Sequence, residues 1–205
     1  MMIPIKKSLF GILLILLAGC ASTEPSRFYT LTPMPGSDAK ILSQAESQDV
    51  SIGVGPVRMP DYLDRQQIVT TSNQNKIKMS EFDRWAGSLK DSFTRVLSEN
   101  LSVLLSTDHV FLFPWRGAIT VDYHIGVDVI QFDGELGGNA SLIARWGIFS
   151  PKEKKVLLVK KSSFTEPVNE KGYEALVAAQ SQALMNLSRD MAAAVKSLSQ
   201  EMSGQ

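Results

Sequence analysis

Residues 118–168 read "AITVDYHIGVDVIQFDGELGGNASLIARWGIFSPKEKKVLLVKKSSFTEPV" and carry the clearest structural pattern in the chain. Three runs rich in β-branched and aromatic residues, at 118–132, 140–149 and 156–168, are separated by the turn-like segments "GELGGN" and "SPKEKK". This pattern is typical of strands joined by short connections, and sequential strands of this kind pair antiparallel. A further strand-like run, "HVFLFPW" at 109–115, precedes them. The stretch therefore predicts an antiparallel sheet.

An amphipathic helix is predicted before these strands. Ser80 and Asp83 have the pattern of an N-cap followed by an acidic residue in the first turn, so we expect the helix to begin at Ser80. Apolar residues then recur at three- and four-residue steps, the spacing of one helix face. They are Phe82, Trp85, Leu89, Phe93, Val96, Leu97, Leu101, Leu104 and Leu105. By this periodicity Trp85 is a core residue.

Earlier segments predict further strands. "RFYTL" at 27–31 and "VSIGVGPV" at 50–57 have strand composition, and "QIVTTSNQNKIKM" at 67–79 predicts a hairpin that turns at residues 73–75. Gly53 and Gly55 either weaken their strand or mark a place where another segment approaches the backbone closely. Residues 32–49 are polar and contain prolines, so they predict a loop.

A second amphipathic helix, with Asn169 as its candidate cap, is predicted to end the domain. One side of it is formed by Tyr173, Leu176, Val177, Gln180, Leu184, Leu187, Met191, Val195 and Leu198. Two amphipathic helices and a sheet bury their apolar faces most simply as two layers. The predicted fold class is therefore α+β: a two-layer sandwich with a mostly antiparallel, mixed sheet and both helices packed on one face.

The first 19 residues have the parts of an export signal. Lys6 and Lys7 precede an apolar run from Leu9 to Ala18, which is too short for a transmembrane helix of about 20 residues. Residues 17–20, "LAGC", resemble the bacterial lipobox, in which the cysteine is acylated and becomes the first residue of the mature protein. Cys20 is the single cysteine of the chain, so it cannot form an internal disulfide. We therefore expect Cys20 to carry a diacylglycerol and an N-acyl chain such as palmitate.

The expected organisation is a signal peptide at 1–19, a lipidated tether at 20–27, one domain at 28–200 and a frayed tail at 201–205. Ser22 stands where sorting rules would place aspartate for inner-membrane retention, so the expected location is the periplasmic face of the outer membrane. Lys plus Arg and Asp plus Glu each total 21, and removal of Lys6 and Lys7 leaves 19 minus 21, or a net charge of minus two. No nucleic-acid partner is expected, because phosphate binding needs a concentrated basic face.

Catalytic chemistry is not indicated. The chain has two histidines, His109 and His124, and its cysteine is assigned to lipid, so no Cys/His zinc site is expected. We find no nucleophile elbow, metalloprotease helix or phosphate-binding loop motif. His124 is interpreted as an exposed strand residue. The protein is predicted not to be an enzyme and to need no metal and no cofactor besides the acyl chains.

Two surface segments each allow two interpretations. In "GPVRMPDYLDRQQIV" at 55–69, the residues Asp61, Tyr62, Leu63, Asp64 and Arg65 can bind a partner. Alternatively, Asp64 and Arg65 pair locally while Tyr62 and Leu63 pack under the sheet. The lysines between residues 152 and 161 can guard a solvated strand edge or contact anionic lipid headgroups.

Several of these motifs together resemble the PqiC family, outer-membrane lipoproteins of the paraquat-inducible Pqi system. They are the lipobox, "GPVRMPDYLDRQQIV", the asparagine turn, "RWAGSL" at 84–89, "LSENL" at 97–101 and "FPW" at 113–115. The resemblance covers residues 17 to about 200. Its most specific part is Tyr62 to Arg65 with Ile68, Val69, Arg84 and Trp85.

The resemblance implies an auxiliary subunit of an MCE-type intermembrane lipid transport complex that supports envelope integrity. Its implied partner is a PqiB-like protein whose MCE domains form a tube across the periplasm and dock on this lipoprotein at the outer-membrane lipid. A homo-oligomeric ring is also implied. Two other classes of function stay open: a lipid carrier with a hydrophobic pocket between helices and sheet, and an envelope hydrolase, for which no nucleophile and base are evident.

Overall fold

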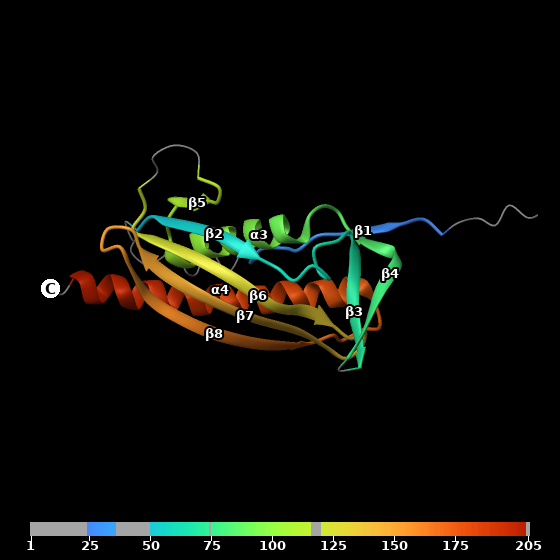
Figure 1. The fold of residues 1–205 in the computed structure, drawn as a ribbon. Coiled ribbons are helices and arrows are strands. Elements are labelled where there is room, and N and C mark those ends of the chain that lie inside the picture. Colours follow the sequence, from blue (N-terminus) through green and yellow to red (C-terminus); the bar gives the residue numbers. More distant parts are fainter. Residues whose placement is uncertain (1–23, 36–49, 74, 116–119, 204–205) are drawn as a thin grey trace, which may run out of the picture.

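The computed structural model of the protein describes residues 24–35, 50–73, 75–115 and 120–203. Within these residues the chain forms two helices and two β-sheets (Figure 1). The strands are β1 (Arg27–Tyr29), β2 (Ile52–Arg58), β3 (Gln67–Asn73), β4 (Lys76–Trp85), β5 (Val110–Leu112), β6 (Tyr123–Gly134), β7 (Asn139–Ser150) and β8 (Lys155–Pro167), and the helices are α3 (Leu89–Leu105) and α4 (Tyr173–Ser203).

The larger sheet has five strands in the order β5-β2-β6-β7-β8. β6, β7 and β8 form the antiparallel arrangement predicted from residues 118–168, and β2 lies parallel to both β5 and β6. Both helices cover the same face of this sheet, because α3 contacts β2 and β5 while α4 contacts β6, β7, β8 and α3. The predicted α+β sandwich is confirmed.

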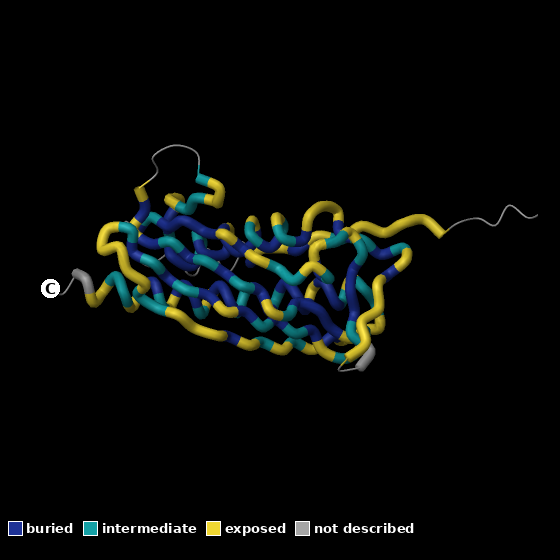
Figure 2. Tube along the Cα trace, in the orientation of Figure 1, coloured by how far each residue is buried: buried dark blue, intermediate teal, exposed yellow. Residues whose placement is uncertain are grey.

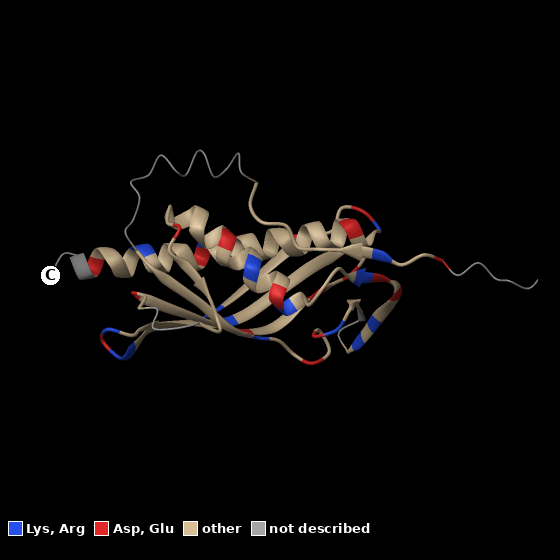
Figure 3. Ribbon diagram, turned by 90° about the horizontal axis from the view of Figure 1, so that it is seen from above, with Lys and Arg blue, Asp and Glu red and all other residues tan. Residues whose placement is uncertain are grey.

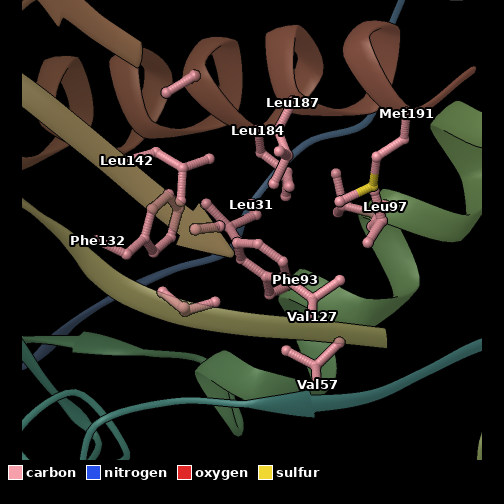
Figure 4. Close-up of a cluster of buried hydrophobic side chains, with 14 of the residues drawn as sticks. Leu31, Val57, Phe93, Leu97, Val127, Phe132, Leu142, Leu184, Leu187 and Met191 are labelled. Carbon is pink, nitrogen blue, oxygen red and sulfur yellow. The ribbon is translucent and has the colours of Figure 1, made fainter. Parts of the chain in front are cut away.

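The main hydrophobic core lies between the helices and the five-stranded sheet. Alternate residues of β6 are buried, because one face of the strand points toward the helices. Figure 4 shows side chains from both helices and several strands packed against one another there. The labelled residues are Leu31, Val57, Phe93, Leu97, Val127, Phe132, Leu142, Leu184, Leu187 and Met191. These side chains occupy the space in which a lipid carrier was expected to hold its ligand.

The segment after β1 packs against both helices. Leu31 and Met34 are buried. The Met34 N–H donates to Asn100 Oδ1 of α3 (2.7 Å), and Asn100 Nδ2 donates to Ser188 Oγ of α4 (3.2 Å). Asn100 is fully buried, and these bonds satisfy its amide. The beginning of the domain is thus held between its two helices.

The first helix begins eight residues later than predicted. Residues 76–85 form β4, and α3 is capped by Ser88, whose Oγ accepts from the Asp91 N–H (3.2 Å). The predicted cap does make its bond, because the Asp83 N–H donates to Ser80 Oγ (2.9 Å). That bond, however, stabilises an irregular part of the β3–β4 ladder. The prediction of a helix from Ser80 is therefore wrong.

A second sheet, absent from the prediction, contains β1, β4 and β3 in the order β1-β4-β3. β3 and β4 are the predicted hairpin, and β1 pairs in parallel with β4. The loop at residues 59–66 leads the chain away from β2, so β3 does not continue in the larger sheet. Trp85 is a core residue, 4% exposed, but it lies on a strand.

Gly53 and Gly55 allow a close approach of the "FPW" segment to β2. A Cβ at residue 53 would lie 2.9 Å from the Trp115 ring, and one at residue 55 would lie 2.6 Å from the Phe113 Cβ. Gly55 also has a φ of 117°, which L-residues rarely adopt. Residues 52–58 therefore form a strand, and the two glycines mark the place where the segment at 113–115 approaches its backbone closely.

The other face of the five-stranded sheet carries no helix, within the part of the chain that is described. Figure 2 shows that β8 is largely exposed while the inner strands are mostly buried. Neither of the two described helices is long and apolar enough to span a membrane.

Candidate functional site

The predicted partner-binding residues lie in the loop at residues 59–66, which joins the two sheets. The N–H groups of Leu63 and Asp64 donate to the Pro60 carbonyl oxygen (2.9 and 3.3 Å) and close a turn. Leu63 is 2% exposed and fixes the loop to the core, whereas Asp61 and Asp64 are exposed. The loop therefore presents two carboxylates from a fixed backbone.

The contacts of the loop agree with one part of the local-packing interpretation and not with the other, and partner binding stays a prediction. Tyr62 and Leu63 pack inward. Asp64, however, does not pair with Arg65, because its Oδ2 lies 3.9 Å from Lys90 Nζ. Arg65 instead donates to the Asp61 carbonyl oxygen (3.5 Å) and to the Met79 sulfur (3.0 Å). Since exposed ion pairs contribute little stability, the Asp64 carboxylate can exchange Lys90 for a basic group of a partner.

Tyr62 attaches the loop to β6. Its hydroxyl donates to Asp133 Oδ2 (3.2 Å), and Gln131 Nε2 donates to the other oxygen of this buried carboxylate (2.8 Å). Burial raises the pKa of Tyr62 to about 12, with the charge and the hydrogen bond of Asp133 adding to the effect. The phenol therefore keeps its proton at neutral pH and continues to donate.

A second polar cluster holds the residues that follow the tether. Arg27 Nε and Nη2 donate to the two oxygens of Asp83 (2.7 and 3.0 Å), and the hydroxyls of Tyr29 and Ser80 also donate to this carboxylate (2.8 and 2.9 Å). Asp83 is only 3% exposed. The hydrogen bonds from Arg27 lower the pKa of Asp83, although its burial acts in the opposite direction. This cluster, the Asp83 clamp, fixes the chain where it enters the domain.

The remaining sequence-based assignments have mixed outcomes. Cys20 lies outside the described residues, so its acylation stays a prediction. His124 is half-buried, not exposed, because its ring stacks on Trp115 (centroids 4.2 Å apart), and burial lowers its pKa. Among the lysines at 152–161, Lys160 forms an ion pair with Asp190 of α4 (2.6 Å). Over the described ranges, no three His, Cys, Asp or Glu side chains are grouped to hold a metal.

A groove that the sequence reasoning missed lies on the outer face of the five-stranded sheet, opposite the helices. It crosses β2, β6, β7 and β8, has a volume of about 490 Å³ and is mostly apolar. We call it the outer-sheet groove; its lining includes Trp115, His124, Gly126, Gly147, Phe149 and Val159. The alternation along β6 and β7 puts these residues on the outward face, but their juxtaposition depends on strand register, which a single sequence does not specify.

The sequence profile of a family described as ABC-type transport auxiliary lipoprotein component matches residues 29–192. The chain is 28% identical over 141 residues to the intermembrane transport lipoprotein PqiC of Escherichia coli (strain K12), which covers 69% of this chain and 73% of that protein. The protein of the same name from Shigella flexneri matches to the same extent.

Two solved structures have a similar fold. A crystal structure of a protein from Xanthomonas campestris has a TM-score of 0.68 at 15% identity and covers 87% of this chain and 100% of its own. A crystal structure of an uncharacterized protein has the same TM-score at 18% identity, covering 84% and 99%. At these identities the likeness supports the architecture alone.

Proposed function

Because the chain belongs to the family of ABC-type transport auxiliary lipoprotein components and is similar to PqiC, we propose that it is a non-catalytic docking subunit of an MCE-type intermembrane lipid transport complex. In this role it is anchored to the periplasmic face of the outer membrane through Cys20. It receives the end of a tube-forming MCE-domain protein and so supports the integrity of the envelope.

The observation that carries the docking proposal is the loop at residues 59–66. Its backbone is held by Leu63 in the core and by Tyr62 on Asp133, so little ordering is needed when a partner binds. Asp61 and Asp64 are exposed on it. We propose that these carboxylates meet basic groups of the tube protein or of a neighbouring copy in a homo-oligomeric ring.

The anchor is tested by replacing the acceptor thiol. In Cys20→Ser the full-length protein is expected to lose its acyl chains and to move from the membrane fraction to the soluble periplasmic fraction. Mass spectrometry of the wild-type protein should find a diacylglycerol and an N-acyl chain on the N-terminal cysteine. An unmodified thiol on a fully soluble wild-type protein would contradict the anchor.

The docking loop is tested by reversing its charge. The double variant Asp61→Lys, Asp64→Lys is expected to lose co-purification with the tube-forming protein, or to change the mass of the oligomer in native mass spectrometry. Asp108→Lys is the matched control, because Asp108 is exposed just beyond the far end of α3, which is about 25 Å long. Equal behaviour of both variants and the wild type would exclude the loop as a contact.

A further inference from the structure

We propose that the outer-sheet groove binds an acyl chain with an anionic head, the chain lying over Gly126 and Gly147 and the head at Arg58 and Arg145. This site is distinct from the loop at residues 59–66, so it does not depend on docking there.

The floor of the groove is bare backbone. Gly126 of β6 lies opposite Gly147 of β7, and no heavy atom outside residues 125–127 lies within 4 Å of the position that a Cβ of residue 126 would take. Val159 of β8 lies opposite Gly147 and is 64% exposed. A Cβ at residue 147 would lie 3.1 Å from the Leu158 carbonyl oxygen, so the open part of the apolar trough lies over Gly126.

One wall of the groove is aromatic. His124 lies opposite Phe149, and Phe149 lies opposite Val156 of β8. Trp115 stacks on His124, and the His124 and Phe149 centroids are 6.2 Å apart. Val156 is 60% exposed on this face. Large exposed apolar side chains beside a groove are characteristic of binding sites in soluble domains.

The opposite wall is charged. Arg58 Nε and Nη2 donate to the Asp128 carboxylate (2.5 and 2.7 Å), which neutralises one cation. Arg145 lies opposite Asp128 in the β6–β7 ladder and lines the same groove. Two arginines and one aspartate leave a net charge of plus one. In neighbouring β8, Lys161 lies opposite Arg145 and adds a further cation. A carboxylate or phosphate next to the hydrocarbon chain is the complementary ligand group.

The dimensions favour an amphiphile over a second protein copy. A volume of about 490 Å³ lies in the range of about 300–1,000 Å³ that is typical of small-molecule sites. A stable protein interface buries about 800 Å² on each partner and needs a broader surface. The adjacent edge strand β8 carries Lys155, Lys160 and Lys161, and lysines on an edge disfavour strand pairing between copies.

The test uses the full-length lipidated protein in phosphatidylcholine nanodiscs and a palmitate that bears a photoactivatable diazirine, with labelled peptides identified by mass spectrometry. In the wild type the label is expected on peptides from β6, β7 and β8. Gly126→Val puts an isopropyl group on the open floor and is expected to reduce this labelling at least tenfold, or about 1.4 kcal/mol. Gly87→Val is the matched control, because residue 87 is equally open but lies outside the groove.

The charged wall is tested with the same probe in its uncharged alcohol form. The acid is expected to label the wild type more strongly than the alcohol, and Arg145→Gln should remove that difference. A photoactivatable lysophosphatidylglycerol then distinguishes a phospholipid head from a free carboxylate. Labelling that is unchanged in Gly126→Val, or crosslinks from the groove peptides to a second copy instead of the probe, would overturn the proposal.

Discussion

Asp83 fixes β1, the first strand of the described domain, through its side chain. Its buried carboxylate accepts hydrogen bonds from Arg27, Tyr29 and Ser80, which come from β1 and from its own strand. A buried carboxylate is tolerated only when it is paired in this way. Because the proposed anchor precedes β1 by a few residues, a force transmitted by the tether would reach the fold first at β1, which the Asp83 clamp and the β1–β4 ladder hold.

Protonation of Asp83 is expected to loosen this clamp. The pKa of Asp83 is lowered in the folded protein from its ordinary value of 3.8, so its contribution to stability is present above about pH 3.8 and is lost as the pH falls through the lower folded value. Asp83→Asn removes the charge and is expected to lower the free energy of unfolding by about 1–3 kcal/mol at neutral pH. Urea unfolding measured over a series of acidic pH values should show a flatter pH dependence for the variant. Asp61→Asn, at an exposed site, should behave as the wild type.

Tyr62 is expected to give the opposite pH dependence. Its pKa is raised from 10.0 to about 12, so its contribution is fully present below about pH 10 and is lost as the pH rises toward 12. Tyr62→Phe removes the bond to Asp133 and is expected to lower stability by about 0.5–1.5 kcal/mol at neutral pH. Its stability should also decline less than that of the wild type under alkaline conditions, as measured by denaturant unfolding. If the stability of the wild type and of Tyr62→Phe declined equally at alkaline pH, a group other than Tyr62 would cause the loss.

At the level of the elements, two glycines of β6 should respond in opposite directions to an added side chain. Gly126 is open, and glycine within a strand destabilises by about 0.5–1 kcal/mol, so Gly126→Val is expected to raise the free energy of unfolding by a similar amount. At Gly134 a Cβ would lie 2.7 Å from the Asn139 carbonyl oxygen, so Gly134→Ala is expected to destabilise by about 1–3 kcal/mol. Thermal unfolding of both variants measures these changes in stability. If both variants were stabilised, or both destabilised, the packing assigned to the two glycines would be wrong.

Ser80 and Ser88 show how far the sequence predicts these elements. Each is followed three residues later by an aspartate, and each accepts a hydrogen bond from that aspartate's N–H, but only Ser88 caps a helix. Long-range contacts decide between them, because the Trp85 N–H donates to the Gln66 carbonyl oxygen (2.7 Å) before the helix can begin. Local pattern specifies the bond but not the element that contains it.

The other differences between the predicted and the observed fold also arise from long-range contacts. The β6–β8 meander and the two helices were predictable because their hydrophobic periods are local. The parallel pairing of β2 with β6 and the separate β1-β4-β3 sheet depend on contacts between distant segments, and so does the groove, which requires Gly126 to lie opposite Gly147. The sequence left the inward packing of Leu63 as one of two equal alternatives. A single apolar residue in a loop belongs to no hydrophobic periodicity that would indicate which way it faces.

On the scale of the whole molecule, β1 and the lysine-rich β7–β8 turn lie at opposite ends. β1 enters at the end that holds the three-stranded sheet, whereas the turn at residues 151–154 lies at the other end (Figures 1 and 3). β8 has 13 residues and therefore spans about 43 Å. From Cys20 to Glu24 an extended chain reaches at most about 14 Å. Anchoring at Cys20 would keep the three-stranded sheet near the bilayer and the turn in solution.

This arrangement can be measured with fluorophores on introduced cysteines, since an acylated Cys20 would leave no competing thiol. In the full-length protein on vesicles that contain brominated phospholipids, a probe at Ser26→Cys is expected to be strongly quenched, because residue 26 lies next to the Asp83 clamp and close to the anchor. A probe at Lys152→Cys is expected to keep its intensity, because the β7–β8 turn lies far from the bilayer. The double variant Lys152→Gln, Lys154→Gln should bind vesicles of anionic lipid as tightly as the wild type. Stronger quenching at residue 152 than at residue 26 would instead place the lysines against the headgroups and reverse the orientation of the molecule.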